Sequence, residues 1–318
     1  MRMLQTQRQV LAVPIQGRHG MPRISINEMT TYHWSLLEDV IGYQAAGIRS
    51  IGVWRRKLCD FGEERGIELL RESRLAVSSL SSAGGFTGSD GQTFREAMDD
   101  ALAAVRQAAE MRAGCLVVVT GSQAGHIFNH ARRLLCDALR ELGDAAGRLG
   151  LSIALQPMHR RPVERWSFLT TLGKTLELLA LCDHPRVGMV FDFFHVWREP
   201  DLTARIPQIV PWIKLVALCD AVAPAGCDDD RCLPGRGDLP VVGLVEALES
   251  SGYRGAYEVQ ILSDRCWRSD YAALLAECRQ ALASICSRTF PLLEDAGVEG
   301  RNVASELPVR PTAAAPPG

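Results

Sequence analysis

Side chains that can transfer or position protons follow several short apolar runs of the sequence. Gln156 and His159 lie at the end of one run, Asp192 and His195 at the end of the next, and Gln260 in the last. Carboxylates and imidazoles are the usual groups for general acid and base catalysis. Carboxamides have no useful pKa for that purpose, but they orient oxygen atoms through hydrogen bonds. We therefore predict that Asp192, His195 and His159 are catalytic and that Gln156 and Gln260 bind substrate.

Each catalytic assignment has a structural alternative. Asp192 could serve only as a hydrogen-bonding residue, and His195 could be a packed histidine. His159 precedes two arginines and also fits a solvated loop. We favour a functional role for Asp192, because an unpaired charge at the end of a strongly apolar strand would be costly.

Four further residues are candidates for binding the substrate. Glu258 shares a strand face with Gln260, because side chains alternate along a strand, and it is either a buried partner or a displaced catalytic carboxylate. Arg236 follows Pro-Gly in a turn and could bind an anionic group, although exposed arginines are common. Asn27 and Trp54 end the first two apolar runs and could form polar and stacking walls of the pocket. A core tryptophan explains Trp54 equally well.

The elements that must position these residues alternate along the chain. Short apolar runs alternate with amphipathic segments, a pattern typical of βα units around a parallel sheet. We expect eight strands, at residues 23–27, 48–54, 75–80, 115–121, 151–156, 187–193, 213–220 and 256–262. Eight such units, with no G-x-G-x-x-G after the first strand, favour a (β/α)₈ TIM barrel, whose active site lies at the C-terminal ends of its strands.

The same pattern sets the expected domain organisation. Residues 1–22 form an N-terminal extension, residues 23–290 a single barrel domain, and residues 291–318, rich in proline and alanine, a flexible C-terminal tail. The sequence leaves a homodimer open.

Composition restricts the classes of partner. The 318 residues include 35 Lys and Arg against 37 Asp and Glu, a formal net charge of −2. This balance lacks the basic excess needed to bind nucleic acid. No run approaches the roughly 20 apolar residues that span a bilayer, and the N-terminus lacks a secretion signal. We expect a cytoplasmic protein whose partner is a small-molecule substrate.

Three segments together resemble the sugar phosphate isomerase/epimerase superfamily of xylose isomerase-like TIM barrels. FDFFHVW (191–197) resembles the D-x-x-H element of the family. LPGRGDLPVVGLVEAL (233–248) and SGYRGAYEVQI (251–261) resemble its P-G-x-G loop, the following helix and its last strand. The resemblance extends from residue 23 to about residue 285. It implies kinship with hydroxypyruvate isomerases, ketose 3-epimerases and inosose dehydratases.

The resemblance also implies a divalent ion, but this chain departs from the expected ligands. The family ligands are two glutamates, an aspartate, and a histidine or glutamine, and they correspond to Gln156, Gln260, Asp192 and Ala217. Only the aspartate is retained, and hard cations need anionic oxygen ligands. We therefore predict a degenerate site with no metal ligands and no cofactor, and weak binding of Mn²⁺ or Mg²⁺ as the second reading.

Three functions remain open from the sequence. The first is an isomerase or epimerase, or a related lyase or dehydratase, that transfers protons without a tightly bound metal. The second is a metal-dependent sugar isomerase or epimerase that uses Asp192 with amide ligands. The third is a non-catalytic barrel that binds a ligand or a partner subunit. A nuclease related to apurinic endonucleases would need a metal cluster and a basic surface, and the sequence shows neither.

Overall fold

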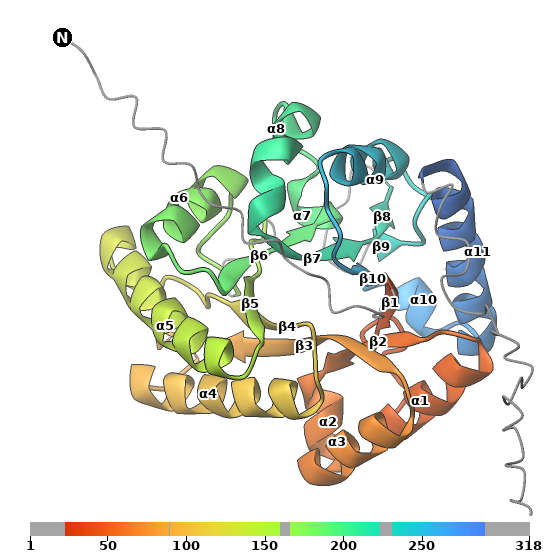
Figure 1. Ribbon diagram of the computed structural model, residues 1–318, viewed down its shortest axis with the longest axis horizontal. Helices are drawn as coiled ribbons and strands as arrows, with labels where there is room; N and C mark the ends of the chain where they lie inside the picture. Colours follow the sequence, from red (N-terminus) through yellow and green to blue (C-terminus); the bar gives the residue numbers. More distant parts are fainter. Residues whose placement is uncertain (1–22, 89, 160–165, 223–230, 290–318) are drawn as a thin grey trace, which may run out of the picture.

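Eight parallel strands form a closed barrel that is surrounded by helices (Figure 1). The structure, a computed structural model, describes residues 23–88, 90–159, 166–222 and 231–289. Around the barrel the strands run in the order β1, β10, β7, β6, β5, β4, β3, β2. They are β1 (Ile24–Asn27), β2 (Ser50–Trp54), β3 (Ala76–Gly84), β4 (Cys115–Val119), β5 (Ser152–Leu155), β6 (Val187–Asp192), β7 (Ile213–Leu218) and β10 (Tyr257–Val259).

The helices cover the outside of the barrel, and most connect consecutive strands (Figure 1). They are α1 (Leu36–Ala45), α2 (Arg55–Phe61), α3 (Glu63–Glu72), α4 (Phe94–Glu110), α5 (Phe128–Arg148), α6 (Leu172–Cys182), α7 (Phe193–Val196), α8 (Leu202–Ile209), the 3₁₀ helix η2 (Val210–Trp212), α9 (Val241–Ser250), α10 (Asp264–Trp267) and α11 (Tyr271–Thr289). Capping boxes begin two of them, Ser35 with Glu38 at α1 and Thr93 with Glu96 at α4.

All eight predicted strands are confirmed, and so is the (β/α)₈ barrel. Several strands begin or end one to three residues inside the predicted ranges, and the largest difference is at β3, which continues to Gly84 instead of ending at Leu80. The serines after Leu80 hide this continuation from a hydrophobic pattern, yet Ala83 and Gly84 still pair with β4 after a register shift. Residues 1–22 and 291–318 lie outside the described residues, so the predicted extension and tail remain predictions.

Two short strands beside the barrel were not predicted. In this pair, β8 (Asp220–Ala221) and β9 (Arg231–Cys232) are antiparallel. Strands of two residues carry no hydrophobic alternation, so a sequence pattern cannot detect them. They place Arg231 next to the ends of the barrel strands.

The barrel interior has an apolar part and a polar part. The apolar part is a cluster of small buried side chains from β4 to β7: Cys115, Val117, Ala154, Val190, Leu215 and Ala217. Across the sheet, Asp192 pairs in register with Ala217, and Ala217 pairs with Glu258. The carboxylates of β6 and β10 therefore belong to one row of the barrel, separated by an alanine.

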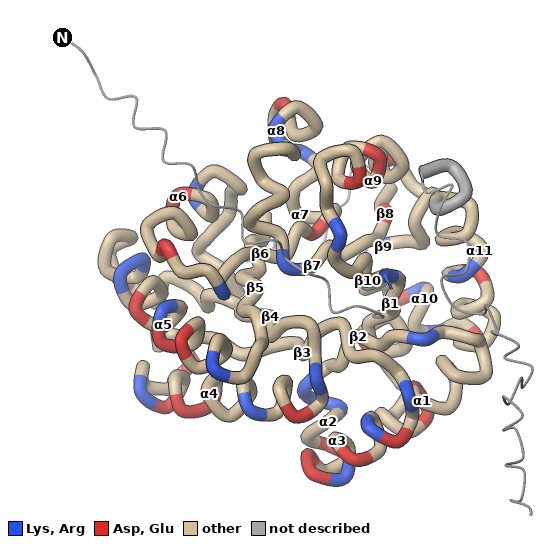
Figure 2. The backbone as a smooth tube through the Cα atoms, viewed as in Figure 1, with Lys and Arg blue, Asp and Glu red and all other residues tan. Residues whose placement is uncertain are grey.

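The outer surface mixes both signs of charge. Arginines lie among aspartates and glutamates along helices α3, α4 and α5 (Figure 2). Within the described ranges, no helix combines the length and apolar character needed to cross a membrane.

Candidate active site

Asp192 ends β6 and is the anchor of a buried polar cluster. Its side chain is 1% exposed and acts as N-cap of α7, where Oδ1 accepts from the backbone N–H of Phe194 at 3.0 Å. Oδ2 accepts from Gln156 Nε2 at 3.1 Å and from Arg231 Nη1 at 3.2 Å. Burial by itself would raise the pKa of Asp192, but the charge of Arg231 and these donors lower it from its ordinary value. Asp192 is therefore an ionised, fully paired carboxylate.

Arg231 is the residue of this cluster that the sequence reasoning missed. Its side chain is 4% exposed and stacks over the ring of Phe194, with Cζ 4.7 Å from the ring centroid. Its Nη2 lies 3.3 Å from Nε2 of His195. The only signal in the sequence is its place just before the Leu-Pro-Gly loop, and the predicted binding residue of that loop is Arg236.

His195 and His159 form a hydrogen-bonded pair of imidazoles. Their Nδ1 atoms are 2.8 Å apart, so one ring donates and the other accepts. Arg231 can only donate, which leaves Nε2 of His195 as an acceptor and places its proton on Nδ1. The backbone N–H of His159 lies 3.4 Å from Nδ1 of His195 and would favour a His195 tautomer with its proton on Nε2. That tautomer, however, points the Nε2–H group of His195 at the guanidinium of Arg231. We assign the first tautomer for this reason.

Both imidazoles are neutral near pH 7. Burial, assisted by the charge of Arg231, lowers the pKa of His195 to about 3 despite the opposing effect of Asp192. Burial and the charges of Arg198 and Arg231 also lower the pKa of His159. His159 is only partly buried, so it is the member of the pair that can meet a substrate.

Glu258 and Asn27 lie inside the barrel and contact each other. The carboxylate of Glu258 accepts from Asn27 Nδ2 at 2.7 Å, from Ser78 Oγ at 2.6 Å and from Ser79 Oγ at 2.7 Å. Burial raises the pKa of Glu258, although these three donors oppose the shift. These contacts give both residues a structural role in the polar part of the interior, and their predicted substrate contacts stay predictions.

Gln260 and Trp54 contact residues outside the Asp192 cluster, and Arg236 is exposed. Gln260 follows β10, and its Nε2 lies 3.1 Å from Sδ of Met29. Trp54 ends β2 and packs against Tyr32, with ring centroids 5.4 Å apart. Arg236 is exposed in the loop after β9. The structure thus joins Gln156, Asp192, His195 and His159 in one hydrogen-bonded cluster, while the other predicted residues make the contacts given above and their roles at the site stay predictions.

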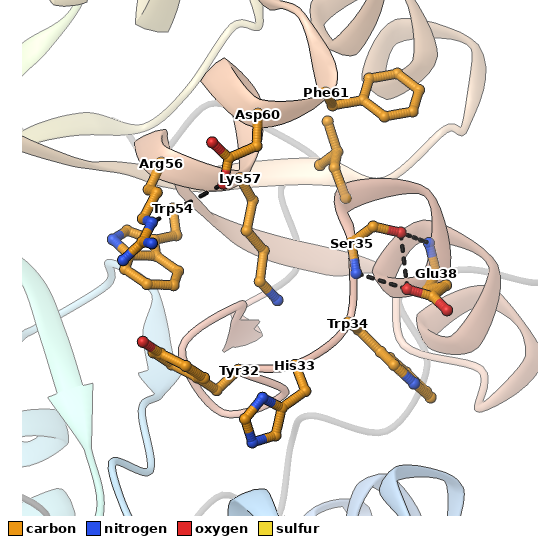
Figure 3. Close-up of a pocket in the computed structure, with 11 residues that line it drawn as sticks. Tyr32, His33, Trp34, Ser35, Glu38, Trp54, Arg56, Lys57, Asp60 and Phe61 are labelled. Carbon is orange, nitrogen blue, oxygen red and sulfur yellow. Dashed lines mark hydrogen bonds and ion pairs between the residues drawn. The ribbon is translucent and has the colours of Figure 1, made fainter.

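A groove lies on the rim between the segment after β1 and helix α2 (Figure 3). It has a volume of about 410 Å³, and its lining includes Tyr32, Trp34, Trp54 and Lys57. Lys57 is itself held by a buried ion pair with Asp39, at 2.6 Å. The predicted wall residue Trp54 therefore faces this groove, which contains none of the Asp192 cluster.

The loop that carries Arg231 is organised by Asp220. Oδ1 of Asp220 accepts from the backbone N–H groups of Ala221 at 2.8 Å and Leu239 at 2.9 Å, and Oδ2 accepts from Gly235 at 3.0 Å. The backbone N–H of Arg231 also donates to Leu262 O at 3.1 Å. These bonds fix the backbone from which the guanidinium reaches Asp192.

The side chains at the family ligand positions do not fit a divalent ion. Ala217 has no ligand atom, Gln156 turns its amide nitrogen toward Asp192, and a guanidinium already contacts both oxygens of that aspartate. Among the described residues, no group of three or more His, Cys, Asp or Glu side chains could hold a metal ion. The donor set is thus that of an ion-paired site.

Two enzymes are similar in sequence to this chain. A 3-dehydroshikimate dehydratase of Pseudomonas putida is 25% identical over 240 residues, which are 72% of this chain and 36% of the dehydratase. A fructoselysine 3-epimerase of Shigella flexneri is 25% identical over 173 residues, which are 53% of this chain and 60% of the epimerase. The chain therefore spans only part of the length of both relatives.

Solved structures agree with the fold. A protein of Sinorhizobium meliloti 1021 superposes with a TM-score of 0.77 at 29% identity, covering 83% of this chain and 98% of that one. IolI, solved with a bound zinc atom, superposes with a TM-score of 0.75 at 19% identity, covering 85% and 99%, a likeness that concerns the fold alone. The family model described as a xylose isomerase-like TIM barrel matches residues 42–299. The chain therefore belongs to the xylose isomerase-like TIM barrel family.

Proposed function

We propose that this chain is a small-molecule isomerase or epimerase, or a related dehydrating lyase, that transfers protons of a polyhydroxylated or keto substrate at the barrel mouth. The names of its relatives, a dehydratase and an epimerase, support this class. The observation that carries the proposal is the Nδ1 to Nδ1 hydrogen bond between His195 and His159. A cytoplasmic location and a homodimer remain proposals beside it.

The imidazole pair can serve both directions of a proton transfer. With the bridging proton on His195, His159 presents an Nε2–H group and acts as an acid. The tautomer assigned above is therefore the acid form. The base form arises when the bridging proton shifts to His159, which leaves a lone pair on its Nε2 and turns the Nε2–H of His195 toward Arg231, so it is the less populated form. Among the described residues no hydrogen-bond partner occupies Nε2 of His159. His159 is therefore the proposed proton-transfer group.

Asp192 has a different role in this proposal from the proton transfer expected of it. Its lowered pKa and four donor contacts make it a poor proton acceptor. It instead holds Arg231 and Gln156, and through Arg231 it sets the tautomer of His195. We propose Asp192 as a positioning residue.

Hydrogen exchange with solvent tests the proposal without requiring a known product. The protein is incubated in D₂O with a panel of ketoses, inososes and 3-dehydroshikimate, and NMR follows deuterium entering carbon positions. We expect exchange on at least one member, and His159→Gln should reduce its rate by roughly 10²–10⁴-fold. His184→Gln, a histidine that precedes β6 and so lies at the opposite end of the barrel, is the matched control. If no compound in the panel exchanges, the non-catalytic reading is favoured.

The proposed enzyme works without a stoichiometric divalent ion. Purified protein should carry clearly less than one equivalent of manganese, zinc, cobalt or magnesium by elemental analysis. Exchange should continue unchanged in the presence of EDTA, because the donor set lacks the anionic ligands that a hard cation needs. Loss of exchange on chelation with recovery on adding Mn²⁺ would instead establish the metal-dependent reading with amide ligands.

A further inference from the structure

We propose that Arg231 is a built-in cation that has taken the place of the divalent ion of this family. Its guanidinium contacts both oxygens of Asp192, at 3.2 and 3.5 Å, and also reaches His195 at 3.3 Å. The family resemblance places the ion on this same aspartate. The guanidinium of Arg231 therefore occupies the position at which the family resemblance places the divalent ion.

The neighbouring amide supports the replacement. A carboxylate only accepts hydrogen bonds, so the 3.1 Å contact requires Gln156 to turn its nitrogen toward Asp192. To act as a metal ligand, Gln156 would instead have to direct its amide oxygen toward the position beside Asp192. With Gln156 and Gln260 in place of two carboxylates, the charge of one guanidinium is enough to balance Asp192.

Three features of the structure fix the position of the Arg231 side chain. It is 4% exposed, stacks on Phe194, and lies on β9, whose backbone pairs with β8. A guanidinium stays charged at every ordinary pH. A fixed, desolvated positive charge of this kind stabilises developing negative charge without rearranging first.

The catalytic part of this inference rests on the proposed function. When Nε2 of His159 takes a proton from the carbon beside a carbonyl, the electron pair of the C–H bond moves to the carbonyl oxygen. Arg231 stabilises the resulting enolate. His159 then returns the proton to carbon, or gives it to a hydroxyl group that leaves as water. No oxidant, reductant or metal enters the balance.

Metal titration of engineered variants tests the replacement independently of activity. The triple variant Gln156→Glu, Ala217→His, Gln260→Glu restores the family ligand types, and a quadruple variant adds Arg231→Gln. Mn²⁺ binding is measured by calorimetry and by the shift of melting temperature, with circular dichroism as the check of folding. We expect the quadruple variant to bind Mn²⁺ roughly 100-fold more tightly than the triple variant. Equal affinity of the two, or one retained equivalent in the wild type, overturns the proposal.

Single variants separate this inference from the proposed function. Arg231→Gln should lower deuterium exchange on the order of 10²–10³-fold, and Arg231→Lys, which keeps the charge, should retain more exchange than Arg231→Gln. Exchange that needs His159 but is unchanged in Arg231→Gln refutes the built-in cation and leaves the proposed function standing. Suppose instead that the quadruple variant binds Mn²⁺ more tightly than the triple variant, but the wild type introduces deuterium into no compound of the panel. This result refutes the proposed function and leaves the replacement of the metal by Arg231 standing.

Discussion

At the level of single residues, Asp192 and Arg231 form a buried ion pair, so removing one charge leaves the other buried without its counter-charge. Asp192 is 1% exposed and balances the buried guanidinium of Arg231. Removing one partner of a buried pair is costly, because the remaining charge stays desolvated. Stability and function should therefore respond together at this position.

Asp192→Asn should destabilise the protein by roughly 3–5 kcal/mol and lower deuterium exchange sharply. Added Mn²⁺ should not restore exchange, because the variant loses a positioning residue and not a metal ligand. Chemical denaturation and the NMR assay measure both effects. Asp99→Asn, on the exposed face of α4, serves as control. Rescue by Mn²⁺ would contradict this account.

A second buried cluster lies beneath the rim groove. The Nζ of Lys57 donates to Asp39 Oδ2 at 2.6 Å and to the backbone carbonyl oxygen of Glu28 at 3.0 Å, while the Glu28 carboxylate accepts from the backbone N–H of Trp54 at 2.6 Å. Burial raises the pKa of Asp39 to about 6, although Lys57 opposes the shift. Burial, with the charge of Asp39, raises the pKa of Glu28 well above its ordinary value.

These raised carboxyl pKa values predict a pH dependence of stability. Above the ordinary carboxyl pKa of about 4 the native state binds more protons than the unfolded chain, so stability falls as pH rises toward and past 6. Glu28→Gln mimics the protonated acid. Its stability relative to wild type should therefore increase with pH, by at most about 1.4 kcal/mol per pH unit. Urea denaturation from pH 4.5 to 8 measures this, with Glu68→Gln as control, and a difference that is constant with pH would refute it.

At the scale of elements, the loop between β9 and α9 determines where Arg231 lies. Asp220 binds three backbone N–H groups around this loop, and a Cβ atom at Gly237 would lie 2.4 Å from Ala221 O and 2.5 Å from Asp220 Oδ1. Only glycine allows the loop to approach its organising carboxylate this closely.

Gly237→Ala should therefore displace the loop and destabilise the protein by about 1–3 kcal/mol, the usual cost of overpacking. Because Arg231 is attached to the same loop, exchange should fall as well. Gly243→Ala is the matched control: apart from the neighbouring residues and backbone of its own helix, no described atom lies within 4 Å of its added Cβ, and in helix α9 it should be neutral or stabilising by up to about 1 kcal/mol. Equal melting temperatures of the two variants would contradict the prediction.

At the scale of the whole molecule, an ion pair joins the first strand to the last helix-strand unit at the end of the barrel opposite the proposed active site. Arg23 precedes β1 and binds Glu249 of α9, with Nη1 to Oε2 at 2.9 Å, while Tyr257 donates to the same carboxylate at 2.7 Å. This contact joins the first and last strands at the N-terminal end of the barrel. In barrels of this fold that end supports stability, and the opposite end carries the chemistry.

Arg23→Met should consequently lower the free energy of unfolding by about 1–2 kcal/mol, because the pair is only partly buried, and leave exchange per folded molecule unchanged. Arg254→Met removes an exposed arginine, 62% accessible, that contacts the same Glu249 at 3.4 Å, and should have little effect. Thermal melts and the NMR assay distinguish the two. A loss of deuterium exchange in folded Arg23→Met would contradict the assignment of the chemistry to the C-terminal end of the barrel.

The sequence by itself determined the barrel and the mouth. Strand and helix patterns are local, so eight apolar runs alternating with amphipathic segments were sufficient to locate every barrel strand. Because strands in a closed parallel barrel end at one face, the ends of neighbouring strands had to bring Gln156, Asp192 and His195 together. The loss of the family ligands was also readable, since it depends only on residue identity.

Only the tertiary structure decided what neutralises Asp192 and what fills the barrel. Arg231 reaches Asp192 across 39 positions of sequence from a strand of two residues, and no local period reports such a contact. Glu258 appeared available to a substrate, but three donors from β1 and β3 surround it. Arg236 was the arginine expected near the substrate, and its loop leaves it exposed. Side-chain direction and long-range pairing depend on packing between elements, which the residue pattern within each element does not encode.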